Sequence, residues 1–197
     1  MADLLPSSST VATLPLADLA HAACMREIVE RGLREVRARH VAERIGVGAR
    51  ELSRLCPWAD LRARAYEQVE NEMMDEVFPP GEKPELVMET WLASAFDART
   101  ARAWQRWSDA WDMSCIDAAM AAAFARIQNR YFEEMSSTLA AGPWRLPDPE
   151  ASAIRLFAIE DGLACQILTC APFITRKRAE SLLRGAFELE CSQRGAI

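Results

Sequence analysis

Residues 32–61 constrain the fold of this chain more than any other stretch. In the segment 38–45, ARHVAERI, apolar residues recur every three or four positions, which places them on one face of a short helix. Gly46-Val47-Gly48 then interrupts the helix, because glycine readily adopts the backbone angles of a tight turn. A second short stripe in residues 49–55 is stopped by Pro57. Two short helices joined by such a turn predict a helix-turn-helix unit, whose second helix can enter a DNA major groove.

Arginines are concentrated around this unit. Between residues 21 and 65 the chain has ten arginines and six acidic residues, whereas the rest of the chain has 13 basic and 23 acidic residues. A basic segment on a chain of net charge −6 is expected where one end meets phosphate. The side chains that the predicted second helix exposes are Arg50, Glu51, Ser53 and Arg54. The other interpretation of these charges is an ordinary solvated helix surface.

The rest of the chain has the apolar periodicity of helices and no alternating pattern typical of a strand. A first helix is predicted from Leu16 to near Gly32, and a longer one through residues 61–77, which Pro79-Pro80-Gly81 ends. Further helical stripes occupy residues 87–95, 104–111, 115–141, 150–170 and 176–189. We therefore expect an all-α fold of about nine helices. The predicted organisation is a flexible arm at 1–13, a helix-turn-helix DNA-binding module at 14–60 and a ligand-binding and dimerisation domain at 61–197.

Composition argues against several classes of protein. Half of the residues are hydrophobic, but no apolar run is long enough to span a bilayer, and no Lys or Arg precedes the first helix. We therefore expect a cytoplasmic protein with no membrane partner. The six cysteines have no CxxC spacing and only His21 and His40 are present, so no metal site is expected beyond the weak pair His21-x-x-Cys24. No catalytic set or cofactor motif stands out, so the sequence predicts neither a reaction nor a cofactor.

Tryptophans mark the candidate ligand site. They are Trp91, in the stripe of residues 87–95, and Trp104, Trp107 and Trp111, which lie at helical spacing near Asp109 and Asp112. Aromatic faces beside carboxylates can receive a cationic or a flat aromatic ligand. The opposite wall is expected on the helix 115–141, whose apolar side begins at Ile116 and which carries Phe124, Gln128 and Tyr131. The alternative is that the tryptophan stripe only packs the core.

Glu160 and Asp161 lie in a segment that is apolar on nearly all sides, residues 150–170. Such a helix is expected to be buried within a bundle or between subunits. An unpaired carboxylate is costly to bury, so these acids should be paired, lie at an edge or face a pocket. The alternative is that both reach solvent or a partner arginine.

Gly32, Val41-Ala42, Gly46-Val47 and Leu52 have the identities and spacing found in the N-terminal module of one family of regulators. The Trp-rich segment around Trp104, Tyr131 and the sequence Asp161-Gly162-Leu163 match one branch of that family more weakly. On these residues the chain resembles the TetR family of one-component transcriptional regulators, and its C-terminal part resembles the BetI-like branch.

The resemblance implies a ligand-responsive regulator, expected to be a repressor. It would bind a palindromic double-stranded DNA operator as a homodimer formed by its last two helices, and a small-molecule effector, aromatic or cationic, would release it. The implied DNA contacts are Arg37, Arg39, Ala49, Arg50, Ser53 and Arg54. The implied ligand contacts are Trp91, Trp104, Trp107, Trp111, Phe124, Gln128, Tyr131 and Asp161.

Four positions depart from the family pattern. Arg37 replaces a capping threonine, Gly48 a serine, Cys56 an aromatic residue and Ala59 a basic residue that contacts phosphate. These departures motivate an alternative, in which the same fold has lost operator binding and acts as a small-molecule-binding protein or an enzyme. A purely structural, dimerising helical protein is a third interpretation, but it leaves the arginine-rich segment unexplained.

Overall fold

The computed structural model describes residues 15–192, and within that range it contains nine α-helices, one short 3-10 helix and no strand. The all-α prediction is confirmed. The helices are α1 (Leu16–Arg31), α2 (Ala38–Ile45), α3 (Ala49–Leu55), α4 (Trp58–Val77), α5 (Pro84–Ser94), η1 (Ala98–Thr100), α6 (Ala101–Ser114), α7 (Ala118–Ala141), α8 (Pro149–Leu168) and α9 (Arg176–Ser192). The arm predicted at residues 1–13 lies outside the described range.

Local chemistry explains where several helices begin and end. Gly46 has a left-handed backbone (φ 72°), and its N–H donates to carbonyl groups of the last turn of α2. The carboxylate of Asp117 accepts the N–H groups of Ala119 and Met120 and so caps α7. The expectation that Ile116 begins the apolar side of this helix was wrong: Ile116 precedes the cap and is 88% exposed. The position of the capping carboxylate, rather than the apolar residue before it, sets where α7 begins.

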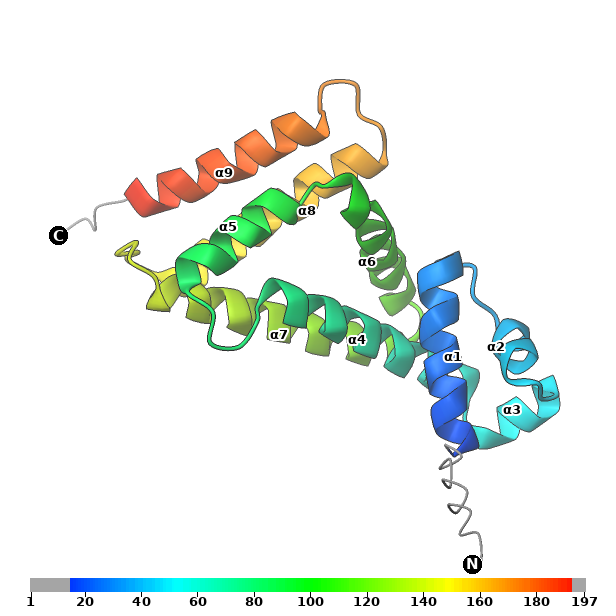
Figure 1. Ribbon diagram of the computed structural model, residues 1–197. Helices are drawn as coiled ribbons and strands as arrows, with labels where there is room; N and C mark the ends of the chain where they lie inside the picture. Colours follow the sequence, from blue (N-terminus) through cyan, green and yellow to red (C-terminus); the bar gives the residue numbers. More distant parts are fainter. Residues whose placement is uncertain (1–14, 193–197) are drawn as a thin grey trace, which may run out of the picture.

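Figure 1 shows α1, α2 and α3 gathered at one end of the molecule, beside the start of α4. Beyond them the helices outline a triangle, of which α4 and α7 form one side, α6 the second, and α5 with α8 the third. Helix α9 packs against α5 and α8 on the outside of the triangle. No helix among the described residues is both long and apolar enough to cross a membrane.

Two apolar cores share α4. The N-terminal core takes side chains from α1, α2 and α3, the first turns of α4 through Tyr66, and parts of α6 and α7 that include Ala110 and Phe124. The second core begins at Met74 on α4 and continues through α5, α7, α8 and α9. We call α1–α3 with the first turns of α4 the N-terminal module. Because α4 is one continuous helix, this module and the rest of the chain, the body, meet along it.

Helices α8 and α9 leave large apolar side chains uncovered in the single chain. Those on α8 are Ile154 and Ile159, and those on α9 are Leu182 and Leu189. Phe173, in the connection between the two helices, is also exposed. Exposed apolar residues that lie along neighbouring helices are typical of a surface that another protein covers.

Candidate nucleic-acid interface and ligand pocket

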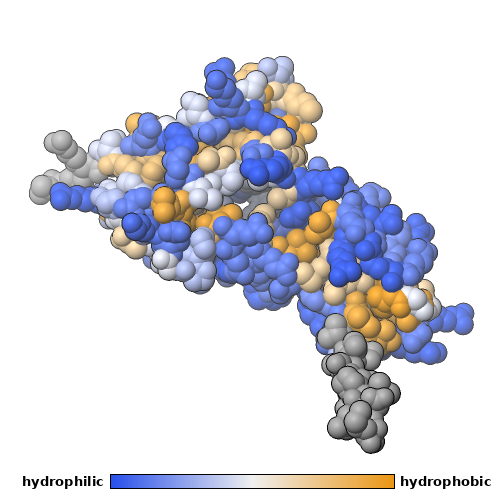
Figure 2. All heavy atoms as spheres, viewed as in Figure 1, coloured by the Kyte–Doolittle hydropathy of each residue, from blue (hydrophilic) through white to orange (hydrophobic). Residues whose placement is uncertain are grey.

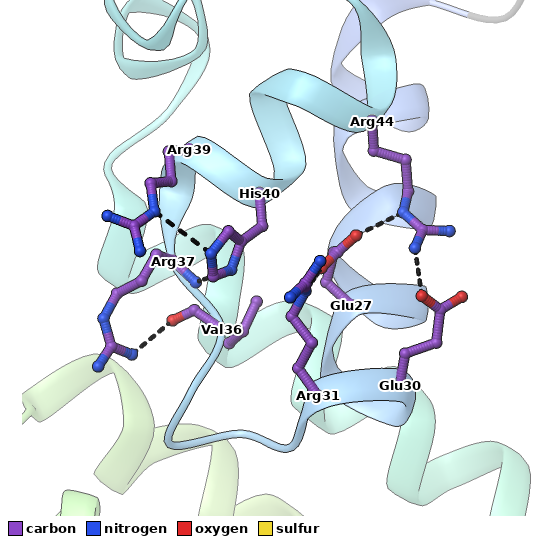
Figure 3. A network of polar contacts seen from close by, with 8 residues as sticks. All are labelled: Glu27, Glu30, Arg31, Val36, Arg37, Arg39, His40 and Arg44. Atoms are coloured by element: carbon purple, nitrogen blue, oxygen red, sulfur yellow. Dashed lines mark hydrogen bonds and ion pairs between the residues drawn. The ribbon is translucent and has the colours of Figure 1, made fainter.

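A buried carboxylate joins α1 to α2 (Figure 3). Glu27 is 2% exposed and accepts a hydrogen bond from Arg44 Nε at 2.6 Å and another from Arg31. Arg44 also binds Glu30, one turn further along α1. Burial raises the pKa of Glu27, but the hydrogen bonds from the two arginines outweigh burial, so its pKa is lowered. These arginines therefore serve the structure of the module.

Four other arginines, at the start of α2 and on α3, have no such role. None of them forms an ion pair with a carboxylate of residues 15–192, and all four are exposed. They are Arg37, Arg39, Arg50 and Arg54, and we call them the arginine surface. Over α2 the molecular surface is largely hydrophilic (Figure 2). Because no carboxylate of the described residues neutralises these guanidinium groups, their charge is available to an external anion.

Helix α2 begins after Arg37, where the family pattern has a threonine whose side chain caps the helix. The backbone N–H of Arg37 donates to His40 Nδ1 at 3.2 Å, so the imidazole supplies an acceptor at the N-terminal end of α2 (Figure 3). The Arg37 guanidinium donates to the carbonyl oxygen of Val36 at 2.9 Å and also to that of Arg34. Bound only to carbonyl groups, it keeps its full positive charge uncompensated.

Leu52 orients α3. It is buried in the N-terminal core, so the polar positions of α3 point outward. The predicted contacts of this helix, Ala49, Arg50, Ser53 and Arg54, are all exposed. Gly48 caps the helix without a side-chain hydrogen bond. Cys56 and Trp58 both pack against the N-terminal core, so an aromatic side chain is supplied there two residues later than in the family pattern.

Ion pairs connect the module to the body. Arg34, between α1 and α2, lies with its Nε 3.3 Å from Asp109 Oδ1 and also binds Asp112, both on α6. Arg62 on α4 binds Asp117 at the start of α7 at 2.8 Å. The sequence had suggested that Asp109 and Asp112 lie beside a ligand, but they pair with Arg34 instead. A pairing between residues so far apart in the chain has no local sequence signal.

The body contains a pocket whose lining comes from α4, α5, η1, α6, α7 and α8. Its volume, including its opening to solvent, is about 630 Å³, and Figure 2 shows the surface hollowed within the triangle of helices. Five predicted ligand contacts line it: Trp91, Trp104, Trp107, Tyr131 and Asp161. Three others do not. Trp111 is 52% exposed, Phe124 is buried against Trp107 in the N-terminal core, and Gln128 is exposed on α7.

Hydrogen bonds hold the aromatic wall of the pocket in place. The Trp91 Nε1–H donates to the hydroxyl of Tyr131 at 2.6 Å, and that hydroxyl in turn donates to Glu160 Oε2 at 3.3 Å. Trp104 Nε1–H donates to the carbonyl of Ala95 at 2.7 Å. The ring of Tyr131 stacks on Phe157 with centroids 4.5 Å apart. The aromatic faces therefore have defined positions before any ligand arrives.

Two adjacent carboxyl groups of α8 line the same pocket. Glu160 is 3% exposed and, within the described residues, has no ion pair. Burial, and then the nearby charge of Asp161, raise the pKa of Glu160 to about 8. Burial raises the pKa of Asp161 to about 6. Of the three expected settings for these acids, which were a paired acid, an edge of the bundle and a pocket, the structure shows the pocket.

Glu70 on α4 is a pocket residue that sequence reasoning missed. It is 1% exposed, and its Oε1 accepts a hydrogen bond from Arg106 Nε of α6 at 2.9 Å. Burial raises the pKa of Glu70, although Arg106 opposes this effect. Its Oε2 is buried without a hydrogen-bond partner, as is Nε1 of Trp107. Tyr66, Glu70 and Met74 recur every four residues, so an acid within an apolar stripe was the available signal.

Comparison with known families gives a match over half of the chain. The model described as the BetI-type transcriptional repressor, C-terminal, matches residues 91–191. This segment contains the aromatic and carboxyl residues of the pocket from α5 to α8. No protein of curated function matches the sequence.

Solved structures share the fold over most of the chain. A structure described as a TetR-family transcriptional regulator from Rhodococcus sp. has 20% identity and a TM-score of 0.70, covering 89% of this chain and 98% of that chain. A transcriptional regulator from Saccharomonospora viridis, in complex with choline, has 17% identity and a TM-score of 0.66, covering 88% and 95%. One from Pseudomonas aeruginosa PAO1 has 18% identity and a TM-score of 0.66, covering 89% and 90%.

Proposed function

Because the chain belongs to the TetR family of transcriptional regulators and has a BetI-type C-terminal domain, we propose that it is a ligand-responsive repressor. In this proposal it binds a palindromic operator as a homodimer, and a small organic cation in the pocket releases it. The observation that carries the proposal is the arginine surface, four exposed guanidinium groups without carboxylate partners in the described residues.

Operator contact is assigned to α2 and α3. Arg37 and Arg39 at the start of α2 are placed to bind phosphate, which fixes position without reading sequence. Arg50, Ser53 and Arg54, with Ala49, lie on the outward side of α3, the helix that would enter the major groove. The acidic net charge of the chain is compatible with this assignment, because the acids are concentrated outside the module.

The homodimer is assigned to α8 and α9. Their exposed residues Ile154, Ile159, Leu182 and Leu189 form apolar positions that a second copy would cover. Two modules related by a two-fold axis would meet half-sites about 34–36 Å apart, one turn of DNA. The predicted boundary near residue 60, between a DNA-binding module and a ligand-binding domain, is part of this proposal.

A cationic effector follows from the composition of the pocket. Trp91, Trp104, Trp107 and Tyr131 offer aromatic faces, and Glu160 and Asp161 offer acidic groups without cationic partners in the described residues. Cation–π contact and charge together favour a quaternary or protonated amine over an anion. The choline complex of the related Saccharomonospora regulator makes choline the first effector to test.

The pocket and the module are joined by the same two helices. Glu70 of α4 lines the pocket and binds Arg106 of α6, and one turn later on α6 Asp109 binds Arg34 of the module. A ligand that shifts α6 relative to α4 would change both contacts. We therefore place the coupling in a population shift between two orientations of the module, of which the ligand favours the one that misses the operator.

Fluorescence anisotropy with DNA from the upstream intergenic region tests this proposal. We expect saturable binding that the unlabelled fragment competes away and that weakens steeply with salt, because bound phosphates release counterions. Adding choline should release the DNA, and adding potassium chloride at the same ionic strength should release much less. A dimer that binds no DNA at low salt would overturn the repressor assignment.

One observation favours the alternative function, a binding protein without an operator. The first turn of α4, beginning Trp58-Ala59-Asp60, has no basic side chain to contact phosphate. If anisotropy detects no DNA binding, calorimetric titration with choline decides this alternative. Binding of choline by a protein that ignores DNA would support a small-molecule-binding role.

A further inference from the structure

The three carboxyl groups of the pocket are not equivalent. Glu70 is paired with Arg106, and Asp161 is only partly buried. Glu160 alone is both buried and, within the described residues, without a cationic partner. The side-chain groups that donate to it are neutral, the hydroxyl of Tyr131 at 3.3 Å and the indole of Trp91. Hydrogen bonds from neutral donors are weak compensation for a buried negative charge.

Among the described residues, the surroundings of Glu160 provide no unpaired cation. Helix α7 contributes Tyr131, α5 contributes the neutral indole of Trp91, and α8 itself contributes the acid Asp161. From α4 and α6 come Glu70 and Arg106, already bound to each other. On α9, which packs against α8, Glu190 pairs with Arg155, and Arg184 pairs with Glu89. Arg106, Arg155 and Arg184 are therefore all paired with other acids.

We propose that Glu160 carries a proton in the empty pocket and that the effector's cation displaces it. The exchange is balanced in atoms and charge: the carboxylic acid and the entering cation become a carboxylate–cation pair, and one proton passes to solvent. Glu160 is thereby the anion that recognises the cation. The inference rests on the proposed cationic effector, and it predicts in addition that the occupancy of the pocket by the cation depends on pH.

The direction of this dependence follows from the protonated state of the empty site. With a pKa of about 8, most Glu160 side chains are neutral at pH 7 and must lose a proton before pairing with a cation. Affinity should therefore rise with pH and level off above about 8. Between pH 6.5 and 7.5 the expected gain is roughly eightfold. Asp161, with a pKa of about 6, adds to the slope only at lower pH.

Isothermal titration calorimetry of the full-length protein with tetramethylammonium chloride tests the exchange. This probe has a fixed charge and no titratable group, so any proton that appears comes from the protein. Titrations at pH 7.0 in phosphate and in HEPES, which differ in ionisation enthalpy, give the number of protons released. We expect about 0.9 proton per bound cation, the protonated fraction of a group whose pKa is about 8.

Two variants assign the proton to its residue. Glu160→Gln should bind the probe at least tenfold more weakly and release almost no proton, because glutamine can neither ionise nor pair with the cation. Asp161→Asn retains Glu160 and should still release most of a proton. Circular dichroism establishes that each variant is folded, and the wild-type proton count does not depend on either of them.

The outcomes separate this inference from the proposed function. Binding without proton release, or undiminished release by Glu160→Gln, would overturn the exchange and leave a cation-responsive repressor standing. If neither tetramethylammonium nor choline binds while operator binding persists, the cationic effector itself is wrong, and the exchange fails with it. Release near one proton that disappears in Glu160→Gln alone supports the exchange.

Discussion

The arginine surface and the pocket are both places where charge is not neutralised by the chain itself, but they differ in sign and in burial. The four arginines lie in water, where an unpaired charge is well solvated and remains charged. Glu160 lies among aromatic rings, where an unpaired carboxylate is poorly solvated. The exposed site is therefore ready for a partner of opposite charge, whereas the buried site must first change its protonation state.

Arginines elsewhere in the same module make this contrast sharper. Arg44 and Arg31 bind Glu27, and Arg34 binds Asp109, so nearby guanidinium groups are neutralised within the chain. Arg50 and Arg54 belong to the same module as Arg31, Arg34 and Arg44. They differ from these three in having no carboxylate partner in the described residues. Arg26 and Arg64 are also exposed and have no ion pair within residues 15–192, so pairing narrows the set of available arginines and the position on α2 or α3 selects among them.

The largest effect is expected when the arginine surface loses two charges. Arg50→Ala combined with Arg54→Ala should weaken operator binding by about 4 kcal/mol, roughly a thousandfold, because each contact of α3 contributes on the order of 2 kcal/mol. The slope of affinity against salt should also become shallower. Anisotropy measures both. Arg102→Ala, an exposed arginine on α6, is the control and should change neither; unchanged binding by the double variant would contradict the assignment of α3.

Removing the partner of a buried carboxylate should have the next largest effect. Arg106→Ala leaves Glu70 unpaired in the pocket wall and should destabilise the protein by about 3 kcal/mol at pH 7. Since an unpaired Glu70 would take up a proton, the loss should be greater at pH 8 than at pH 5. Urea unfolding at fixed protein concentration gives the free energies.

The double variant Glu70→Gln with Arg106→Met is the matched control for this pair. It removes both charges together, so it should recover most of the stability that Arg106→Ala loses. A double variant as unstable as Arg106→Ala would mean that packing, rather than unpaired charge, causes the loss.

Neutralising Glu160 should stabilise the empty protein in alkaline solution. Its pKa is raised in the folded state above the ordinary value of 4.5, so its favourable contribution is complete below that pH and is lost as the pH rises through about 8. Glutamine does not ionise, so the stability of Glu160→Gln has no such dependence on pH at this position. The advantage of the variant over wild type should therefore grow by roughly 3 kcal/mol between pH 5 and pH 8. Urea unfolding at the two pH values measures it, and a pH-independent difference would exclude the raised pKa.

The smallest effect is expected at an exposed ion pair. Arg126 of α7 binds Glu67 of α4 through two hydrogen bonds of 2.7 Å, yet the arginine is largely in solvent. Arg126→Ala should change the free energy of unfolding by less than about 0.5 kcal/mol. Comparison of this variant with Arg106→Ala shows whether the loss of unfolding free energy depends on the burial of an ion pair or only on its presence. A loss as large as that of Arg106→Ala would mean that burial does not determine how much an ion pair contributes to stability.

Most of the fold was predictable because the signals are local. Glycine, proline and apolar spacing placed α1, α2 and α3 at their observed bounds, and the sequence Phe78-Pro79-Pro80-Gly81 ended α4. The segment before α7 was mispredicted because an apolar residue, Ile116, was given more weight than the capping acid beside it. Helix ends depend on backbone hydrogen bonds, which a hydrophobic pattern does not report.

The pocket was predictable only in part, because its polar members depend on tertiary contacts. Trp91, Trp104, Trp107 and Tyr131 were identifiable as aromatic residues within three separate helical stripes. Trp111 has the same spacing but lies on α6 beyond the pocket, at a position that only packing determines. Glu70 becomes a pocket residue through Arg106, 36 residues away. A pairing over that separation leaves no pattern in a single sequence.

The shared helix α4 has a consequence for anyone who builds hybrid regulators from this protein. A junction at residue 60 would leave Leu61, Ala63 and Tyr66, which complete the N-terminal core, in the half that carries the pocket. A transplanted N-terminal module would then have to pack against foreign side chains, as would a transplanted body. A hybrid made by exchanging the N-terminal module should instead be joined after Tyr66 and before Glu70, and its residues should match Arg34, Asp109 and Arg62 as well.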